Sequence, residues 1–217
     1  MAAEHLIIYG NWHLTNKLVY KNLNTKLFTK QINHETFMNV LLAGYTDKRY
    51  YHTFRHIKYM LTHTKDFFLS PREEAKLELA IWFHDVVYNA KEIDNEMKSS
   101  LVFYEYAKRI DLRKKETENI VQLILDTTHK ESPKTRLGKI ICDLDLREMS
   151  EPEQINNTPK IRKEYSHLSD GEFDKGRKAF LENMLNKKYI YNTDDYRESL
   201  EAQARHNLTV EMESINQ

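Results

Sequence analysis

Apolar side chains recur every three or four positions along most of this 217-residue chain, the spacing that places them on one face of an α-helix. The pattern predicts helices in the segments 33–44, 53–61, 71–85, 94–109, 120–124, 137–144, 173–185 and 196–208. The clearest start is at Ser70, a hydroxyl N-cap followed by a proline and by Glu73, which can complete a capping box. Asn33 and Asp94 are further N-cap candidates, and Gly44 is expected to end the first helix in the left-handed conformation.

Composition agrees with this helical pattern. Only 5 glycines and 4 prolines are present, whereas 40% of the residues are hydrophobic and 30% are charged, a balance typical of amphipathic helices rather than of a turn-rich β fold. The length suits one large core, and no shift in composition marks a linker. We therefore expect an all-α fold in a single domain that spans residues 1–217.

Charge and cysteine content exclude several classes of protein. Lysine plus arginine equal aspartate plus glutamate at 33 each, so there is no strong nucleic-acid signal and no net field to attract an anionic membrane. The apolar residues 6–9 are too few for a signal-peptide core, and no stretch approaches the ~20 apolar residues that span a bilayer. Cys142 is the only cysteine, which excludes an internal disulfide and a thiolate-rich metal site. We expect a cytoplasmic protein with no membrane partner.

A histidine-aspartate doublet, His84 and Asp85, interrupts the most apolar segment of the chain. On a helix, His84 continues the stripe of Ala80 and Ile81 toward the core, and the carboxylate of Asp85 flanks it. Burying an ionised carboxylate without a partner is strongly unfavourable, so it needs a cation, several hydrogen bonds or a metal ion. Neighbouring side chains, about 100° apart on a helix, can converge on one ion. The doublet is therefore a candidate metal-binding element.

Two further pairs of polar residues lie on other helical segments: His52 with His56, and Asp143 with Asp145. His56 lies on the helix proper and is the favoured ligand, whereas His52 lies one turn earlier and is expected to support the site or contact substrate. The two aspartates flank Leu144 on opposite sides, so periodicity does not choose between them. Nitrogen and oxygen donors without thiolate suit Mn, Fe, Co, Ni or Zn, and Mg less well because of the imidazoles.

In this order, the residues resemble the HD superfamily of metal-dependent phosphohydrolases, defined by a histidine, a His-Asp doublet and a distant aspartate on a helical bundle. More narrowly, the chain is similar to predicted HD phosphohydrolases with the motif Tyr-His-Thr-x-x-His-Ile, which begins here at Tyr51. The pattern of this subgroup continues in residues 80–88 (AIWFHDVVY), 94–96 with Ser99, 143–146 (DLDL), 161–165, 176–177 and 204–207. The resemblance implies an HD-like bundle with a motif core over about residues 45–150 and with C-terminal helices over 151–217 packed on it.

The resemblance also implies a ligand set for one divalent metal ion. His56, His84, Asp85 and one aspartate further along the chain would hold it. Asp143 is the first choice for that aspartate because it follows an apolar run, as the last ligand does in many HD proteins. Asp145 is the alternative.

The implied activity is hydrolysis of a phosphoester in a nucleotide or another small phosphorylated metabolite by a metal-activated water. Glu96, a short loop beyond the doublet, is expected to orient this water or act as the general base. Asp85 and His52 are the other catalytic candidates. Arg55 or Lys91 is expected to hold the phosphate, on the grounds of charge and proximity in the sequence.

The chain departs from the binuclear members of the superfamily, which use two additional histidines between the doublet and the last aspartate. Only His129 lies in that interval, so we expect one ion, with His129 as the first candidate ligand for a second. A non-catalytic HD-like module that binds a nucleotide or a protein is the alternative function. A di-iron oxygenase is disfavoured by the missing histidine, and a homo-oligomer is compatible with the sequence.

Several polar and charged residues in the C-terminal third are expected to be structural. They include Arg162, Glu164, Tyr165, Arg205 and Asn207. We expect them to supply internal ion pairs and hydrogen bonds that hold the C-terminal helices to the bundle.

Overall fold

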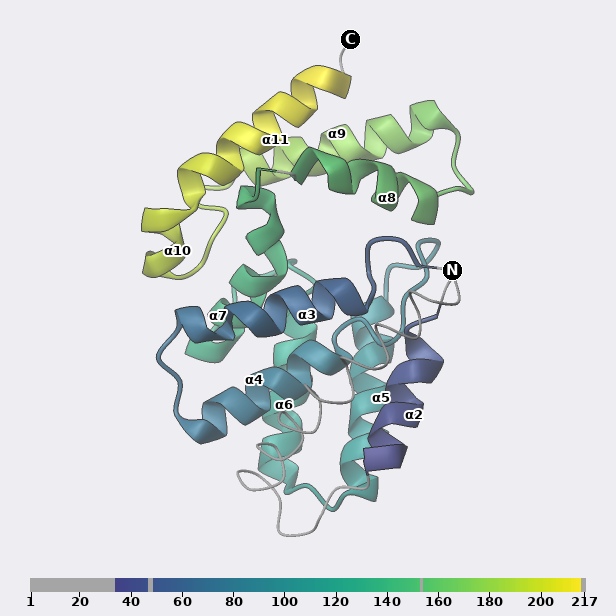
Figure 1. Cartoon of the computed structure of the whole chain (residues 1–217), viewed down its shortest axis with the longest axis vertical. Helices are drawn as coiled ribbons and strands as arrows, with labels where there is room; N and C mark the ends of the chain where they lie inside the picture. Colours follow the sequence, from purple (N-terminus) through teal and green to yellow (C-terminus); the bar gives the residue numbers. More distant parts are fainter. Residues whose placement is uncertain (1–33, 47–48, 153, 216–217) are drawn as a thin grey trace.

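Helices make up all of the regular structure in the part of the chain that the structure describes. The computed structural model describes residues 34–46, 49–152 and 154–215 (Figure 1). In chain order, the α-helices are α2 (His34–Gly44), α3 (Phe54–His63), α4 (Pro71–Phe83), α5 (Asn95–Arg109), α6 (Lys114–Asp126), α7 (Arg136–Leu146), α8 (Thr158–Glu164), α9 (Asp170–Asn186), α10 (Asp194–Ser199) and α11 (Glu201–Ile215). Short 3₁₀-helices are η1 (Thr64–Asp66), η2 (Arg147–Ser150) and η3 (Gln154–Asn157). The all-α prediction is confirmed.

Capping side chains define the starts of the three helices that meet at the candidate site. The predicted capping box is present in α4, where Ser70 accepts the N–H of Glu73 and the Glu73 carboxylate accepts the N–H of Ser70 (2.9 Å). Thr53 caps α3 by accepting the N–H two residues later (3.3 Å). Thr135 caps α7 by accepting the N–H three residues later (3.0 Å). These caps satisfy otherwise unpaired donors and so help to fix where each helix begins.

Helices α2 to α7 form the lower part of the molecule in Figure 1, and α4 packs against α3, α5, α6 and α7. The second half of α4 is buried, and aromatic rings surround its end. Phe37 of α2 lies against Trp82 and Phe83, with ring centroids 6.1 and 6.0 Å apart. Phe83 also contacts Phe103 and Tyr106 of α5. Burial of these large apolar surfaces holds the carboxyl end of α4 in place.

Helices α8, α9 and α11 form the upper part of Figure 1 and connect to the lower bundle through η2 and η3. Helix α11 packs against α9 and η2. Its Glu211 is 1% exposed, yet the carboxylate is fully engaged, because it accepts hydrogen bonds from Arg177 (2.7 Å), Gln154 (2.8 Å) and Thr158 (2.5 Å). A guanidinium partner and neutral donors therefore balance this buried charge within the protein.

The end of α4 differs from the sequence prediction. The helix ends at Phe83, His84 is its C-cap, and Asp85 lies in the following turn. Gly44 ends α2 as predicted, but not in the left-handed conformation. A Cβ atom at Gly44 would lie 2.3 Å from the backbone oxygen of Val86, so glycine is needed there for close approach to the turn after the doublet.

Two other helix predictions need correction. The apolar stripe over residues 196–208 is divided at Leu200 into α10 and α11, next to Glu201, whose carboxylate accepts the N–H groups of Ile190 and Tyr191 (2.9 and 3.2 Å). Asp94 precedes α5, but its side chain makes no capping hydrogen bond there.

Two sequence features, residues 6–9 and the predicted N-cap Asn33, lie outside the described residues. Among the described helices, none combines the length and the apolar character needed to cross a membrane.

Candidate metal centre

Three donor side chains from separate elements meet between α3, the end of α4 and α7. His56 belongs to α3, His84 follows α4, and Asp145 belongs to the last turn of α7. One ligand atom of each lies within 4.8 Å of the other two, and both histidines are buried. Asp145 Oδ1 lies 3.0 Å from His56 Nε2 and 3.7 Å from His84 Nε2. Two imidazoles and a carboxylate at this spacing are suited to one divalent ion.

The hydrogen bond of His84 leaves one ring nitrogen available to this cluster. Its Nδ1 lies 2.8 Å from the backbone oxygen of Ile81, which can only accept, so Nδ1 carries a proton. Its Nε2 is buried and has no hydrogen-bond partner among the described residues, although Asp85 Oδ2 lies 3.2 Å away. Metal-binding histidines commonly have this arrangement, with one nitrogen fixed by a carbonyl and the other free for the ion.

The carboxylates of the cluster favour positive charge on the neighbouring histidines. Burial opposes the charged form of His56, but the hydrogen bond to Asp145 and the nearby carboxylate of Glu148 outweigh this effect and raise the pKa of His56 to about 9. Burial also opposes protonation of His84, yet Asp85 and Asp145 raise its pKa well above the ordinary value. Burial favours a neutral Asp145, but hydrogen bonds with His129 and His56 and the nearby ring of His84 hold its pKa well below the usual range. A divalent cation can supply the positive charge that these protons otherwise provide.

The structure reverses the expected order of the two aspartates on α7. Asp143, the first choice for the last ligand, is fully buried outside the cluster. Its Oδ1 accepts hydrogen bonds from N and Nδ2 of Asn192 (2.6 and 3.0 Å), and its Oδ2 accepts them from N and Oγ1 of Thr193 (2.7 and 2.6 Å). Side chains two positions apart on a helix point about 200° apart. Asp143 therefore holds the loop before α10, and Asp145 is the aspartate that reaches the histidines.

Asp85 adjoins the cluster without being one of its three donors. Burial opposes its ionisation, but the charges of His84 and His52 hold its pKa below the usual range. Arg49 donates to the backbone oxygens of Asp85 and Val86, the latter at 3.0 Å. No pattern in the sequence pointed to this arginine. Its hydrogen bonds stabilise the turn that contains Asp85.

His129 lies on the opposite edge of the Asp145 carboxylate. Its Nε2 is 2.8 Å from Asp145 Oδ2, whereas His56 contacts Oδ1. His129 follows α6 with φ of 53°, a left-handed conformation that few residues other than glycine adopt. His129, the candidate ligand for a second ion, thus lies beside the cluster but is not one of its three donors.

Glu96, in the first turn of α5, lies within electrostatic reach of the cluster. Burial raises the pKa of its carboxyl group, and the negative charges of Asp85 and Asp145 raise it further. A carboxylate with a raised pKa is a stronger base at neutral pH. This environment is compatible with the role expected for Glu96.

His52 is oriented by a residue from the C-terminal part of the chain. Its Nδ1 lies 2.7 Å from Oε2 of Glu164 in α8, and its ring stacks on Tyr88 with centroids 4.0 Å apart. The other oxygen of Glu164 accepts the N–H groups of Tyr50, Tyr51 and His52 at 2.7, 2.8 and 3.1 Å. The sequence analysis treated Glu164 as part of C-terminal packing. In the structure, this carboxylate connects α8 to the candidate site.

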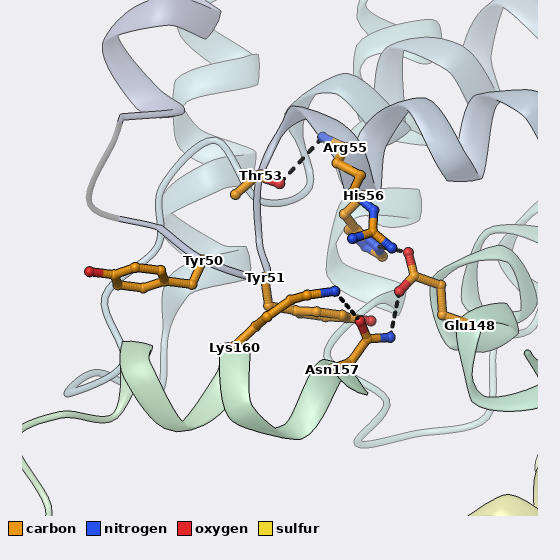
Figure 2. A pocket seen from close by; sticks show the side chains of 8 residues that line it. All are labelled: Tyr50, Tyr51, Thr53, Arg55, His56, Glu148, Asn157 and Lys160. Carbon is orange, nitrogen blue, oxygen red and sulfur yellow. Dashed lines mark hydrogen bonds and ion pairs between the residues drawn. The ribbon is translucent and has the colours of Figure 1, made fainter. Parts of the chain in front are cut away.

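The two phosphate-binding candidates do not contact the three-donor cluster within the described residues. Arg55 is exposed and lines a hollow next to His56 (Figure 2). Lys91 is exposed, and its backbone N–H donates to Asn89 Oδ1 (3.1 Å). Of the two, only Arg55 lies at a concave surface that adjoins a cluster residue.

Comparisons with known proteins identify no matching family model, no similar curated protein and no similar solved structure. The geometry of the site is therefore the basis for a functional conclusion.

Proposed function

We propose that this protein is a metal-dependent phosphohydrolase of the HD type, which binds one divalent ion through His56, His84 and Asp145. The observation that carries the proposal is His84 Nε2, a buried nitrogen with no hydrogen-bond partner among the described residues, directed at a carboxylate and a second imidazole. Leaving such an atom unpaired costs about 1–3 kcal/mol, which a ligand bond would offset. Asp85, 3.2 Å from this nitrogen, would be the fourth protein ligand.

Nitrogen and oxygen donors favour Mn, Fe, Co, Ni or Zn. When bound, such an ion supplies Lewis-acid stabilisation of a phosphoryl oxygen and favours the deprotonation of water. Glu148 lies 3.9 Å from His56 Nδ1 and would hold the ring in its ligating orientation.

Two residues of the chain are proposed to transfer protons. Glu96 would accept a proton from the attacking water, which its raised pKa favours. His52 would donate a proton or a hydrogen bond to the leaving oxygen, and Glu164 would fix its tautomer because the carboxylate accepts the Nδ1 proton. Carboxylate–imidazole pairs of this kind orient proton-transferring histidines in several enzyme classes.

The substrate proposed is a nucleotide or another small phosphorylated metabolite. A non-catalytic nucleotide- or protein-binding module would keep the ion without turnover. A di-iron oxygenase would bind two irons and consume oxygen.

The experiment is a phosphate-release assay on the full chain after chelation and after reloading with each candidate metal. p-Nitrophenyl phosphate and a set of nucleoside mono-, di- and triphosphates serve as probes. We expect activity that chelation abolishes, that one or more metals restore, and that Asp145→Asn lacks. Asp143→Asn is the matched control on the same helix, and folded protein of this variant should keep the metal. Stoichiometric metal with no release of phosphate from any probe would contradict the proposal.

A further inference from the structure

A small surface hollow lies next to His56, on the side of the ring that carries Nδ1 (Figure 2). One wall is the segment over residues 50–56, with the ring of Tyr51. The opposite wall consists of Glu148, Asn157 and Lys160. The hollow thus lies between the lower bundle and α8, and His56 belongs both to its wall and to the metal cluster.

Two cations, Arg55 of α3 and Lys160 of α8, line this hollow without carboxylate partners. Lys160 Nζ donates to the neutral Asn157 Oδ1 (2.8 Å). Among the described residues, neither cation has a carboxylate oxygen within 4.0 Å. Burial lowers the pKa of Lys160, and the positive charge of Arg55 lowers it further. The two cations therefore repel each other across the hollow.

The one carboxylate that lines the hollow is already engaged elsewhere. Glu148 accepts a hydrogen bond from Asn157 Nδ2 (2.8 Å) and lies 3.9 Å from His56 Nδ1. The resulting chain of contacts, Lys160 to Asn157 to Glu148 to His56, fixes the position of the ammonium group (Figure 2). Glu148 lies within electrostatic reach of both cations, but among the described residues it forms no ion pair with either of them.

Within the described residues, two arginines of the C-terminal part, unlike Arg55 and Lys160, do form ion pairs with carboxylates of the chain. Arg177 holds Glu211 at 2.7 Å, and Arg205 holds Glu201 at 2.8 Å. Cations with a structural role in this region thus bind a carboxylate of the chain. Among the described residues, the pair at the hollow has no such carboxylate and is available to an anion from outside the chain.

We infer that Arg55 and Lys160 form a binding subsite for a phosphate group. A guanidinium offers two parallel N–H donors to a tetrahedral oxyanion, and an ammonium adds a point charge from the other side. The inference rests on the proposed function in one respect, namely that this phosphate belongs to the substrate. Because the subsite lies on the Nδ1 side of His56 and the cluster on its Nε2 side, this phosphate is not the one that is hydrolysed. The substrate class would then be small molecules that carry a second phosphate group.

The test is an NMR titration of the metal-free full chain with inorganic phosphate at constant ionic strength, with chloride as the reference anion. We expect saturable shifts at the Asn157 side-chain amide and at the backbone amide of Lys160. Lys160→Gln and Arg55→Gln should each weaken phosphate binding about tenfold, the usual effect of losing a charge-assisted hydrogen bond. Lys160→Arg should restore most of it. Lys175→Gln removes an equal charge from an exposed position of α9 and should change nothing.

The failure of the subsite and the failure of the proposed function give different results. Asp145→Asn should lose metal and phosphohydrolase activity but keep phosphate binding at the hollow, which supports the subsite independently. Equal phosphate affinity in the wild type, Lys160→Gln and Arg55→Gln would overturn the inference. So would phosphate binding that appears only with metal and is lost in Asp145→Asn, because the anion would then bind at the metal centre alone.

Discussion

Two regions on either side of α7 bury a carboxylate, and they do so by different means. Asp143 faces the loop before α10, where four N–H and O–H groups from Asn192 and Thr193 satisfy both of its oxygens. Asp145 faces α3 and α4, where its neighbours are the rings of three histidines.

The direction of each pKa shift separates the two regions. Burial raises the pKa of Asp143 despite its hydrogen bonds, because neutral donors do not fully replace water around the charge. Burial acts in the same direction on Asp145, yet the histidines lower its pKa well below the usual range. Neutral donors satisfy both oxygens of Asp143, whereas Asp145 lies within reach of two buried imidazoles that can exchange their protons for a metal ion, so the region of Asp145 is the candidate metal centre.

The largest expected effect comes from exchanging the two carboxylates for amides. Asp145→Asn should weaken binding of the preferred divalent ion by more than about 100-fold, beyond the 10–100-fold typical of outer-shell changes. Asp143→Asn should leave the affinity of folded protein within about threefold, because its carboxylate is not a ligand. Isothermal titration with each candidate metal measures both. Equal losses of metal affinity in the two variants would contradict the claim that Asp145 is a ligand and Asp143 is not.

The second prediction concerns stability. Asp143→Ala leaves the donors of Asn192 and Thr193 without their acceptor and should lower the free energy of unfolding by about 2–4 kcal/mol. Removing Asp145 should cost the metal-free protein less, since it removes the hydrogen bonds with His56 and His129 only, whereas Asp143 accepts four. Urea denaturation of both variants after chelation gives the comparison. A larger loss for Asp145→Ala would show that both carboxylates serve mainly to hold the fold.

The third prediction is a pH dependence confined to the metal-free protein. Because the pKa of His56 is raised from an ordinary 6.5 to about 9 in the folded state, its protonation stabilises the fold below pH 6.5. That contribution is lost as the pH rises from 6.5 through 9. The Tm of chelated protein should therefore fall over this range, and metal should remove this fall because the ion replaces the proton. A Tm that is independent of metal between pH 6.5 and 9 would contradict this.

The fourth prediction tests the link from α8 to the site. In Glu164→Gln, the amide oxygen can still accept backbone N–H groups, but the amide nitrogen donates to His52 Nδ1 and shifts the proton to Nε2. We expect phosphohydrolase activity to fall at least about tenfold, within the range of general acid–base effects, with an unchanged fold. Nitrogen NMR of the imidazole reports the tautomer. Glu198→Gln, at an exposed position of α10, is the control and should behave as wild type.

The smallest effect is expected at His129. Because it contacts the second oxygen of Asp145 and is not one of the three donors, His129→Ala should change metal affinity by no more than about tenfold, as for an outer-shell residue. The stoichiometry should stay at one ion per chain. A fall from two ions to one would instead assign His129 to a second metal site.

Local chemistry made the helices predictable from the sequence. The capping box at Ser70 and the apolar stripes define α4 and the other long helices, because caps and periodicity are local properties. The same stripes predicted that His56 and His84 face the core. In the structure, both belong to one cluster.

The remainder of the site depends on partners distant in the sequence. The choice between Asp143 and Asp145 was decided by Asn192 and Thr193, about fifty residues further along the chain. Glu164 reaches His52 across 112 residues. In the sequence, such residues resemble ordinary loop or surface positions, and no local spacing marks their contacts.

Anomalous X-ray scattering at the absorption edge of the bound metal tests the central claim most directly. Crystals of the reloaded full chain should show one peak per chain, bounded by His56 Nε2, His84 Nε2 and a carboxylate oxygen of Asp145. Crystals with no peak at this position, or with a peak at Asp143 instead, would contradict it.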